Sequence, residues 1–267
     1  MNTPFIRSGC MLGLAGAALA TLSCTAPVLL PGLASHGLAD QRMLWGLTGG
    51  VNALACLPMA LAGAAGLALL VRAGARIGSA AQRTLGVLCL GGLVVLALAS
   101  AAYDLDPGDA RQQLERAAVM LVLSGLLGLC AAGQIGERAG FSLGLAALGL
   151  GSAALEHAVL AGDPLPWRLF EAACLAAPAW MAGLPTRRSA LAVNGLGVAA
   201  AGIACALFAL GDATVYLATA GWVSGRSLAH LASAALVLPL IAALLRPGRR
   251  VQNATATAAA PLSAAQA

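Results

Sequence analysis

The stretch that decides the fold is Ala81–Ala102, AQRTLGVLCLGGLVVLALASAA, which carries no charge after Arg83. A helix that crosses the hydrocarbon core of a bilayer needs roughly 20 mostly apolar residues. The segment meets this requirement with an almost unbroken run of leucine, valine, alanine and glycine. We therefore expect it to cross a membrane as an α-helix.

The rest of the chain has the same character. Of its 267 residues 60% are hydrophobic and only 9% are charged, and the mean hydropathy is +0.87. An average soluble domain is about 45–50% apolar and about 25% charged. This composition excludes an ordinary water-soluble enzyme, a disordered chain and a nucleic-acid-binding module. All 15 basic residues are arginine, and alanine, glycine and leucine are abundant, which indicates a GC-rich bacterial gene. We expect a protein integral to a bacterial inner membrane.

Apolar runs long enough to span a bilayer recur along the chain. They are Cys10–Leu30, Leu47–Val71, Ala81–Ala102, Leu114–Ala132, Ala139–Ala161, Leu169–Leu184, Ser189–Leu210 and Leu228–Leu245. They predict an all-α polytopic membrane protein, with an N-terminal helix or signal-anchor in residues 1–34 and a core of seven helices in residues 35–250. Residues 251–267 lack periodicity and are expected to form a disordered tail. The first run could instead be a cleaved signal peptide, although its length favours an uncleaved helix.

The arginines predict the orientation of the chain. With the N-terminus in the cytoplasm, ten arginines fall in inside segments and five in outside segments. Cytoplasmic loops of membrane proteins carry such an excess, so we expect both termini in the cytoplasm. The seven cysteines lie within apolar runs without CxxC spacing, which favours buried free thiols over disulfides or a metal cluster.

Polar residues gather in three segments at the outer ends of the predicted helices. Ionisable groups at membrane depth are costly, so each segment is a candidate functional site. The segments are SHGLADQR at 35–42, SAAYDLDPGDAR at 100–111 followed by Glu115-Arg116, and SGRSLAH at 224–230. Taken singly, each segment could also be an ordinary polar loop. Glu156, His157, Glu171 and Asp212 near the same face are expected to be interfacial residues rather than site residues.

Spacing brings the ionisable residues of these segments together. Ser100 and Asp104 are four residues apart and share a helix face, as do Arg226 and His230, while Glu115 can fold back from the next helix. We expect Asp104, Glu115, Arg226 and His230 to converge in one polar pocket that opens to the periplasm. The alternatives are that Glu115 satisfies a helix N-terminus and that His230 is a hydrogen-bonded core residue.

The three segments, in this order, resemble the CREST superfamily of seven-helix membrane hydrolases, in particular the bacterial branch related to alkaline ceramidases and phytoceramidases. Residues 36–42 are similar to the family segment His-x-Phe-Ala-Asp-Gln-Arg. Residues 100–116 are similar to Ser-x-x-Tyr-His followed by Pro-Asp-x-Ala-Arg and Asp-Arg, and residues 224–230 to Ser-Gly-His-x-Leu-Lys-His.

In that family three histidines hold a zinc ion, beside a serine and an aspartate, and the zinc-bound water attacks the amide of ceramide. The resemblance implies a sphingolipid-like membrane lipid as the substrate and Ser100 and Glu115 as catalytic residues. It implies Asp104 and His230 as zinc ligands, although Asp104 stands where the family has a histidine. Arg226 stands at the position of another family histidine, and Cys56 at that of an asparagine.

The remaining pocket residues that the resemblance implies are His36, Asp40 and Arg226. A guanidinium group stays protonated and offers only donors, so Arg226 cannot ligate zinc. Beside two carboxylates it can form a bidentate ion pair where the metal would lie.

Three functions are therefore open. The first is a divergent metal-dependent lipid amidase, with Asp104 and His230 as zinc ligands and Glu115 positioning water. The second is a non-catalytic, lipid-binding pseudoenzyme in which Arg226 replaces the metal, and the residues favour it over the first. The third is a small transporter, which is disfavoured because the sequence shows no internal repeat.

Overall fold

The structure is a computed structural model that describes residues 37–74, 78–184, 191 and 193–245. Its elements in chain order are β1 (Met43–Leu44), β2 (Leu47–Thr48), α2 (Gly50–Leu54), α3 (Leu57–Ala73), α4 (Ala80–Leu105), α5 (Asp109–Gln134), α6 (Glu137–Leu160), α7 (Leu165–Met181), α8 (Gly195–Leu210), α9 (Asp212–Ala218), α10 (Gly225–Ala235) and α11 (Leu238–Leu244). The predicted N-terminal helix, His36 and the predicted disordered tail lie outside these residues.

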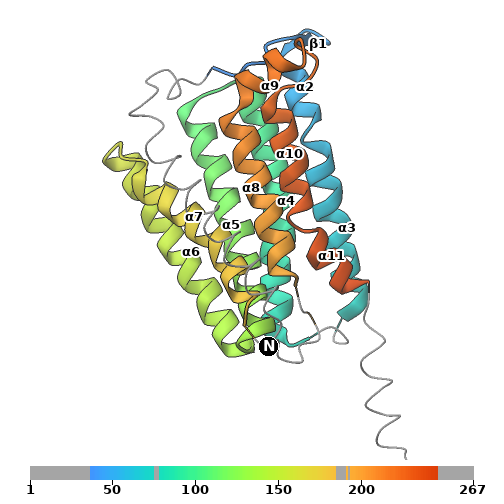
Figure 1. Cartoon of the computed structure of the whole chain (residues 1–267), viewed down its shortest axis with the longest axis vertical. Coiled ribbons are helices and arrows are strands. Elements are labelled where there is room, and N and C mark those ends of the chain that lie inside the picture. Colours follow the sequence, from blue (N-terminus) through green and yellow to red (C-terminus); the bar gives the residue numbers. More distant parts are fainter. Residues whose placement is uncertain (1–36, 75–77, 185–190, 192, 246–267) are drawn as a thin grey trace, which may run out of the picture.

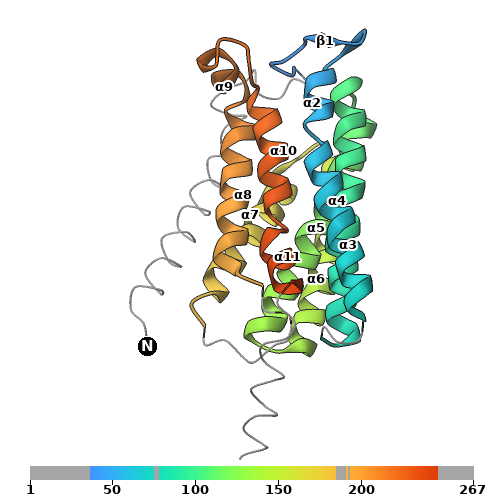
Figure 2. The same cartoon turned by 90° about the vertical axis from the view of Figure 1, so that its right-hand side faces the viewer.

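The helices form an elongated bundle in which the chain runs repeatedly from one end to the other (Figure 1). Strands β1 and β2, the start of α2, and α9 lie together at one end in both views, and this end is called the hairpin end below (Figure 2). Helix α5 lies inside the bundle and packs against α4, α6 and α7, while α10 packs against α3 and α8. The polar segments at 100–111 and 224–230 are thereby brought to the hairpin end.

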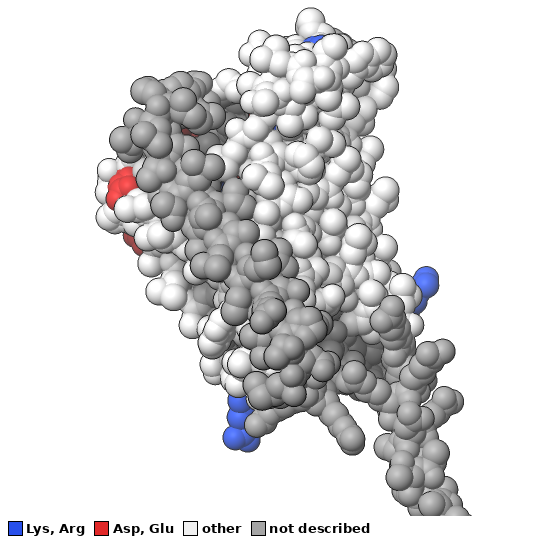
Figure 3. All heavy atoms as spheres, viewed as in Figure 1, with Lys and Arg blue, Asp and Glu red and all other residues white. Residues whose placement is uncertain are grey.

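The prediction of a mostly helical protein with several helices suited to cross a membrane is confirmed. Among the described residues, five helical segments are long and apolar enough to cross a membrane: α2 with α3, α4, α5, α6, and α10 with α11. The number is six if α8 and α9, which meet at a bend of 77°, form one span. Helix α7 has 17 residues and is not among them. On the face seen in Figure 3, the described residues are mostly uncharged, and the few charged atoms lie near its margins.

Two of the predicted runs are divided in the structure. The run Leu47–Val71 becomes β2, α2 and α3. Strand β2 pairs with β1 in antiparallel fashion, with Met43 opposite Thr48, which is a small departure from an all-α fold. The last run begins at Gly225 rather than Leu228 and is divided into α10 and α11 just before Pro239. Proline has no backbone N–H to donate to the preceding turn, so a helix tends to break there.

A glycine fixes how the hairpin meets the site-bearing end of α4. Gly49, the N-cap of α2, has a φ of +72°, which a residue with a side chain rarely adopts. A Cβ atom at this position would overlap the backbone carbonyl oxygen of Asp104. Glycine at position 49 therefore lets α2 lie directly on the last turn of α4.

Candidate functional site

Five polar side chains from three helices meet at the hairpin end. Helix α4 contributes Ser100 and Asp104, α5 contributes Glu115, and α10 contributes Arg226 and His230. These five residues are called the polar cluster. The side chain of Asp104 is wholly buried, and the others are largely buried. The predicted convergence of Asp104, Glu115, Arg226 and His230 is confirmed.

Arg226 lies at the centre of the polar cluster. Its Nε donates to Oδ1 of Asp104 at 2.5 Å, and its Nη2 donates to Oε1 of Glu115 at 2.7 Å. The guanidinium carbon also lies 4.9 Å from the centroid of the Tyr103 ring, within the range of a cation–π interaction. One arginine thus bridges the carboxylates of two helices and links α10 to both α4 and α5.

His230 and Ser100 complete the hydrogen bonds of the two carboxylates. Nε2 of His230 lies 2.8 Å from Oδ2 of Asp104, and Oγ of Ser100 donates to Oε1 of Glu115 at 2.7 Å. An ionised carboxylate can only accept, so Nε2 of His230 must carry the proton in this arrangement. With neutral His230 the polar cluster has one net negative charge, and with the imidazolium it has none.

A neutral hydrogen-bond network fixes the start of α10. Ser224 is the N-cap residue, and its Oγ accepts from the backbone N–H of Ser227 at 3.0 Å. The hydroxyls of Ser224 and Ser227 also lie 2.7 and 2.8 Å from Oδ1 of Asn52 in α2. Because α2 in turn lies on the end of α4, this network sets the distance between Asp104 and the helix that carries Arg226.

Asp212 contributes from outside the polar cluster. Its Oδ1 accepts from the backbone N–H of Arg226 at 2.7 Å, and its Oδ2 accepts from the backbone N–H of Ala39 at 3.0 Å. A carboxylate that accepts from the first turn of a helix stabilises that helix N-terminus. Asp212, predicted to be only an interfacial residue, therefore joins the segment before the hairpin to the start of α10.

The other described residues that the sequence analysis named lie outside the polar cluster. Asp40 is buried, but it forms an ion pair with Arg42 (2.6 Å) and is not one of the residues that contact Arg226. The hydrogen bonds from Arg42 hold the pKa of Asp40 below its ordinary value, against the opposing effect of burial. Arg42 also donates to the carbonyl of Trp222, so this ion pair joins the hairpin to the segment after α9. His157, in the last turn of α6, lies 3.7 Å from Asp163 just beyond that helix, and both side chains are half exposed.

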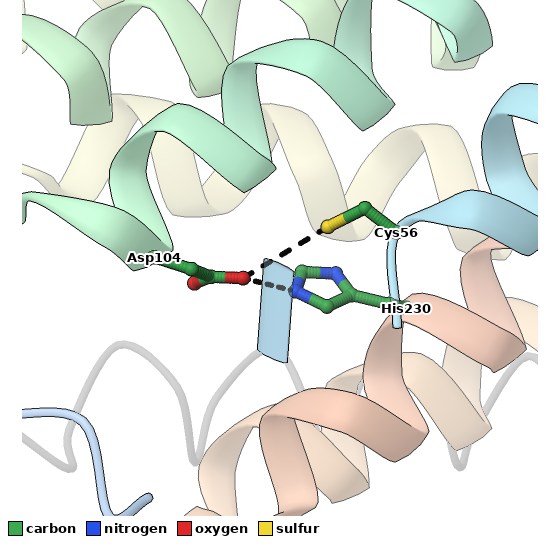
Figure 4. A group of neighbouring side chains, drawn as sticks. All are labelled: Cys56, Asp104 and His230. Carbon is green, nitrogen blue, oxygen red and sulfur yellow. Dashed lines mark hydrogen bonds and ion pairs between the residues drawn. The ribbon is translucent and has the colours of Figure 1, made fainter. Parts of the chain in front are cut away.

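Cys56 is a neighbour that the residue patterns did not single out, because a lone cysteine in an apolar run is typical of a core residue. Its Sγ lies 3.9 Å from Oδ2 of Asp104 (Figure 4). The same sulfur lies 3.6 Å from the carbonyl of Asn52. Ligand atoms of Cys56, Asp104 and His230 all lie within 4.8 Å of one another. Thiolate, carboxylate and imidazole are all zinc ligands, so the donor types and their spacing are suitable for a metal.

The charges around these donors are less suitable. Both oxygens of Asp104 already accept hydrogen bonds, one from Arg226 and one from His230. A metal at this point would lie beside a permanent guanidinium charge that is bound to the same carboxylate. The three donors therefore do not fit a zinc site while Arg226 remains on Asp104.

A cavity of about 400 Å³ extends from the polar cluster into the bundle between α4, α5, α7, α8 and α10. This volume is within the range of small-molecule pockets, about 300–1,000 Å³. Ser100, Glu115, Arg226 and His230 contribute to its wall near the hairpin end, together with Arg116, Arg168 and Glu171. Deeper in the bundle the wall is apolar, formed by residues that include Met59, Leu96, Val122, Leu123, Leu175 and Leu236.

Comparison with known proteins gives no further guide to the site. No family model matches the chain, and a search of curated proteins finds no match either. The resemblance to the CREST superfamily accordingly rests on the three polar segments alone.

Proposed function

We propose that this protein binds a membrane lipid, or a sphingolipid-like amphiphile, in the interhelical cavity without using a metal. The observation that carries the proposal is the double ion pair of Arg226 with Asp104 and Glu115 at the polar end of a largely apolar cavity. In this proposal Arg226 supplies the positive charge that a metal would otherwise supply. The protein is then a non-catalytic, ceramidase-like membrane protein.

The two parts of the cavity suit the two parts of such a ligand. Acyl chains gain free energy when they leave water, and the deeper wall offers them leucine, valine and methionine side chains. The headgroup would lie among groups that both donate and accept hydrogen bonds. The hydroxyl of Ser100 and the carboxylate of Glu115 line this part of the cavity.

A second candidate is a divergent metal-dependent lipid amidase, in which Ser100 and Glu115 would act on a linear amide. It is favoured by the closeness of Cys56, Asp104 and His230. It requires Arg226 to leave Asp104, which would free one carboxylate oxygen but remove one of the two carboxylate partners of the guanidinium group. We therefore rank it second, and the metal content of the purified protein distinguishes the two candidates.

The proposal also covers the number of membrane-spanning helices and their orientation. We infer that α7 also crosses the membrane, which completes a CREST-like core of seven helices after one N-terminal helix. We further infer a bacterial inner membrane with both termini in the cytoplasm, from the excess of arginine in the loops assigned to that side. The hairpin end and the polar cluster would then face the periplasm.

Lipid that copurifies with the protein tests the proposal. In Ala206→Phe a bulky ring would project from the wall of the cavity, whereas in the control Leu207→Phe it would lie on the exposed side of the same helix. After brief detergent extraction, mass spectrometry should find a bound amphiphile in the wild type and in Leu207→Phe, and much less in Ala206→Phe. Equal amounts in all three proteins would contradict the proposal.

A further inference from the structure

We propose that the cavity selects an amphiphile with an anionic headgroup, a carboxylate or a phosphate, through Arg116 and Arg168. This inference rests on the proposed function and names the class of ligand. The two arginines come from α5 and α7, and both line the cavity. Neither belongs to the polar cluster.

Arg116 and Arg168 have only one carboxylate in direct contact between them in the described part of the chain. Nη1 of Arg168 lies 3.2 Å from Oε2 of Glu171, one turn further along α7. Arg116 lies within electrostatic reach of both residues, but it forms no ion pair or hydrogen bond with any residue that the structure describes. Two guanidinium groups therefore share one carboxylate, and this part of the wall has one excess positive charge.

Glu115, the nearest carboxylate of the polar cluster, lies within electrostatic reach of Arg116 but forms no ion pair with it in the described part of the chain. Glu115 precedes Arg116 in the sequence, but its Oε1 already accepts from Arg226 and Ser100. Arg226 is likewise engaged, because both its Nε and its Nη2 donate to carboxylates. The net negative charge of the polar cluster therefore offsets the positive charge of Arg116 across the cavity, but no described carboxylate is in direct contact with the Arg116 guanidinium group.

A guanidinium group that has no carboxylate in direct contact is costly at the edge of a membrane, and a bound anion would remove that cost. The planar fork of arginine donates two parallel hydrogen bonds to a carboxylate or a phosphate, which makes these groups its preferred anionic ligands. Since the same cavity continues into an apolar region, the ligand that satisfies both parts is an anion with a hydrocarbon chain.

Trp167 provides a direct reporter of such a ligand. It precedes Arg168, is fully buried and lines the cavity, whereas Trp45, Trp180 and Trp222 are exposed. Replacing these three exposed tryptophans with phenylalanine leaves Trp167 as the single fluorophore. A bromine atom on an acyl chain quenches tryptophan fluorescence only at close range, so quenching shows that the chain has entered the cavity.

The experiment compares three probes of equal chain length, ω-bromododecanoate, ω-bromododecyl phosphate and ω-bromododecanol, in the single-tryptophan protein in detergent. We expect one or both anionic probes to quench Trp167 at concentrations about tenfold below that of the alcohol, because a charge-assisted hydrogen bond is worth at least that factor. The preference between the two anions identifies the headgroup. Arg116→Gln and Arg168→Gln should raise the concentrations needed for the anions toward that of the alcohol and leave the alcohol unchanged.

Arg111→Gln is the matched control, because Arg111 binds Asp106 at the surface and does not line the cavity. Quenching at the same concentration by all three probes, or anion binding unaffected by both arginine variants, would overturn the anion site and leave the proposed lipid cavity standing. The absence of quenching by any probe would overturn the cavity as a lipid site as well. If the arginine variants fail to fold, the comparison of the anionic probes with the alcohol on the single-tryptophan protein still tests whether the cavity prefers an anion.

Discussion

The replacement of Arg226 by alanine is the sharpest perturbation of the polar cluster. It removes the partner of a wholly buried carboxylate, Asp104, and of a largely buried one, Glu115. Ser100 and His230 keep their single hydrogen bonds to these groups, but neither hydroxyl nor neutral imidazole supplies a compensating charge. Arg226→Ala therefore leaves the carboxylates of Asp104 and Glu115 without a positively charged partner in a poorly hydrated site.

Breaking a buried ion pair from one side typically costs about 3–5 kcal/mol. The arginine side chain retains 20% of its exposure and that of Glu115 retains 16%, so water reaches part of the site. We therefore expect a loss near the lower end, about 3 kcal/mol in the free energy of unfolding. For a chain of this size that corresponds to a decrease in Tm of about 6–12 °C.

Thermal unfolding in detergent, followed by circular dichroism, measures this decrease. Arg226→Lys keeps the charge but loses the two-pronged geometry, so its Tm should lie between those of the wild type and Arg226→Ala. Adding Glu115→Gln to Arg226→Ala removes one stranded charge and should restore part of the loss. A Tm for Arg226→Ala within about 2 °C of the wild type would refute the reasoning.

Three other outcomes follow from the surroundings of the polar cluster. Gly49→Ala should lower the free energy of unfolding by about 1–2 kcal/mol more than Gly46→Ala. Both glycines have positive φ, but only at position 49 would the new Cβ overlap a backbone oxygen, and chemical denaturation compares the two. The Asp40–Arg42 pair should stabilise the fold above the unfolded carboxyl pKa of about 4 and lose this effect as the pH falls through the lower folded value. The Tm of Asp40→Asn should therefore lie below that of the wild type at neutral pH and approach it below about pH 4, and a gap that stays constant would exclude this pair as the cause. A reporter enzyme that is active only in the cytoplasm should be active when it is fused to the C-terminus, because the arginine distribution places that terminus in the cytoplasm. Activity of a reporter that works only in the periplasm would contradict the proposed orientation.

The long apolar segments were the most predictable part of the fold. Ala81–Ala102 is contained within α4, because hydropathy alone forces such a segment into a helix. Helix α5 begins at Asp109, five residues before the predicted Leu114, since a helix can continue from the membrane into the polar interface while hydropathy falls. The breaks before α3 and α11 were missed, because a proline near a helix start is compatible with either a kink or a continuous span.

The candidate site was predictable only where spacing along a helix places residues on one face. That Arg226 and His230 share a helix face follows from their spacing, and that both reach Asp104 follows from the cost of charge in lipid. Cys56 and Asp212 join the site through packing between distant segments, which no local pattern encodes. The excess charge of Arg116 likewise becomes visible only when its neighbours across the cavity are known.

The central claim is that Arg226 takes the place of a metal in balancing the carboxylates of the polar cluster. The most direct measurement is the zinc content of the protein purified in zinc-supplemented detergent buffer, for the wild type and for the double variant Asp104→His, Arg226→His. The double variant places two histidines beside His230 and removes the guanidinium group, so it should bind about one zinc ion per chain, since zinc favours three imidazoles and a water. The wild type should bind far less than one. Near-stoichiometric zinc in the wild type would contradict the claim and favour the metal-dependent amidase.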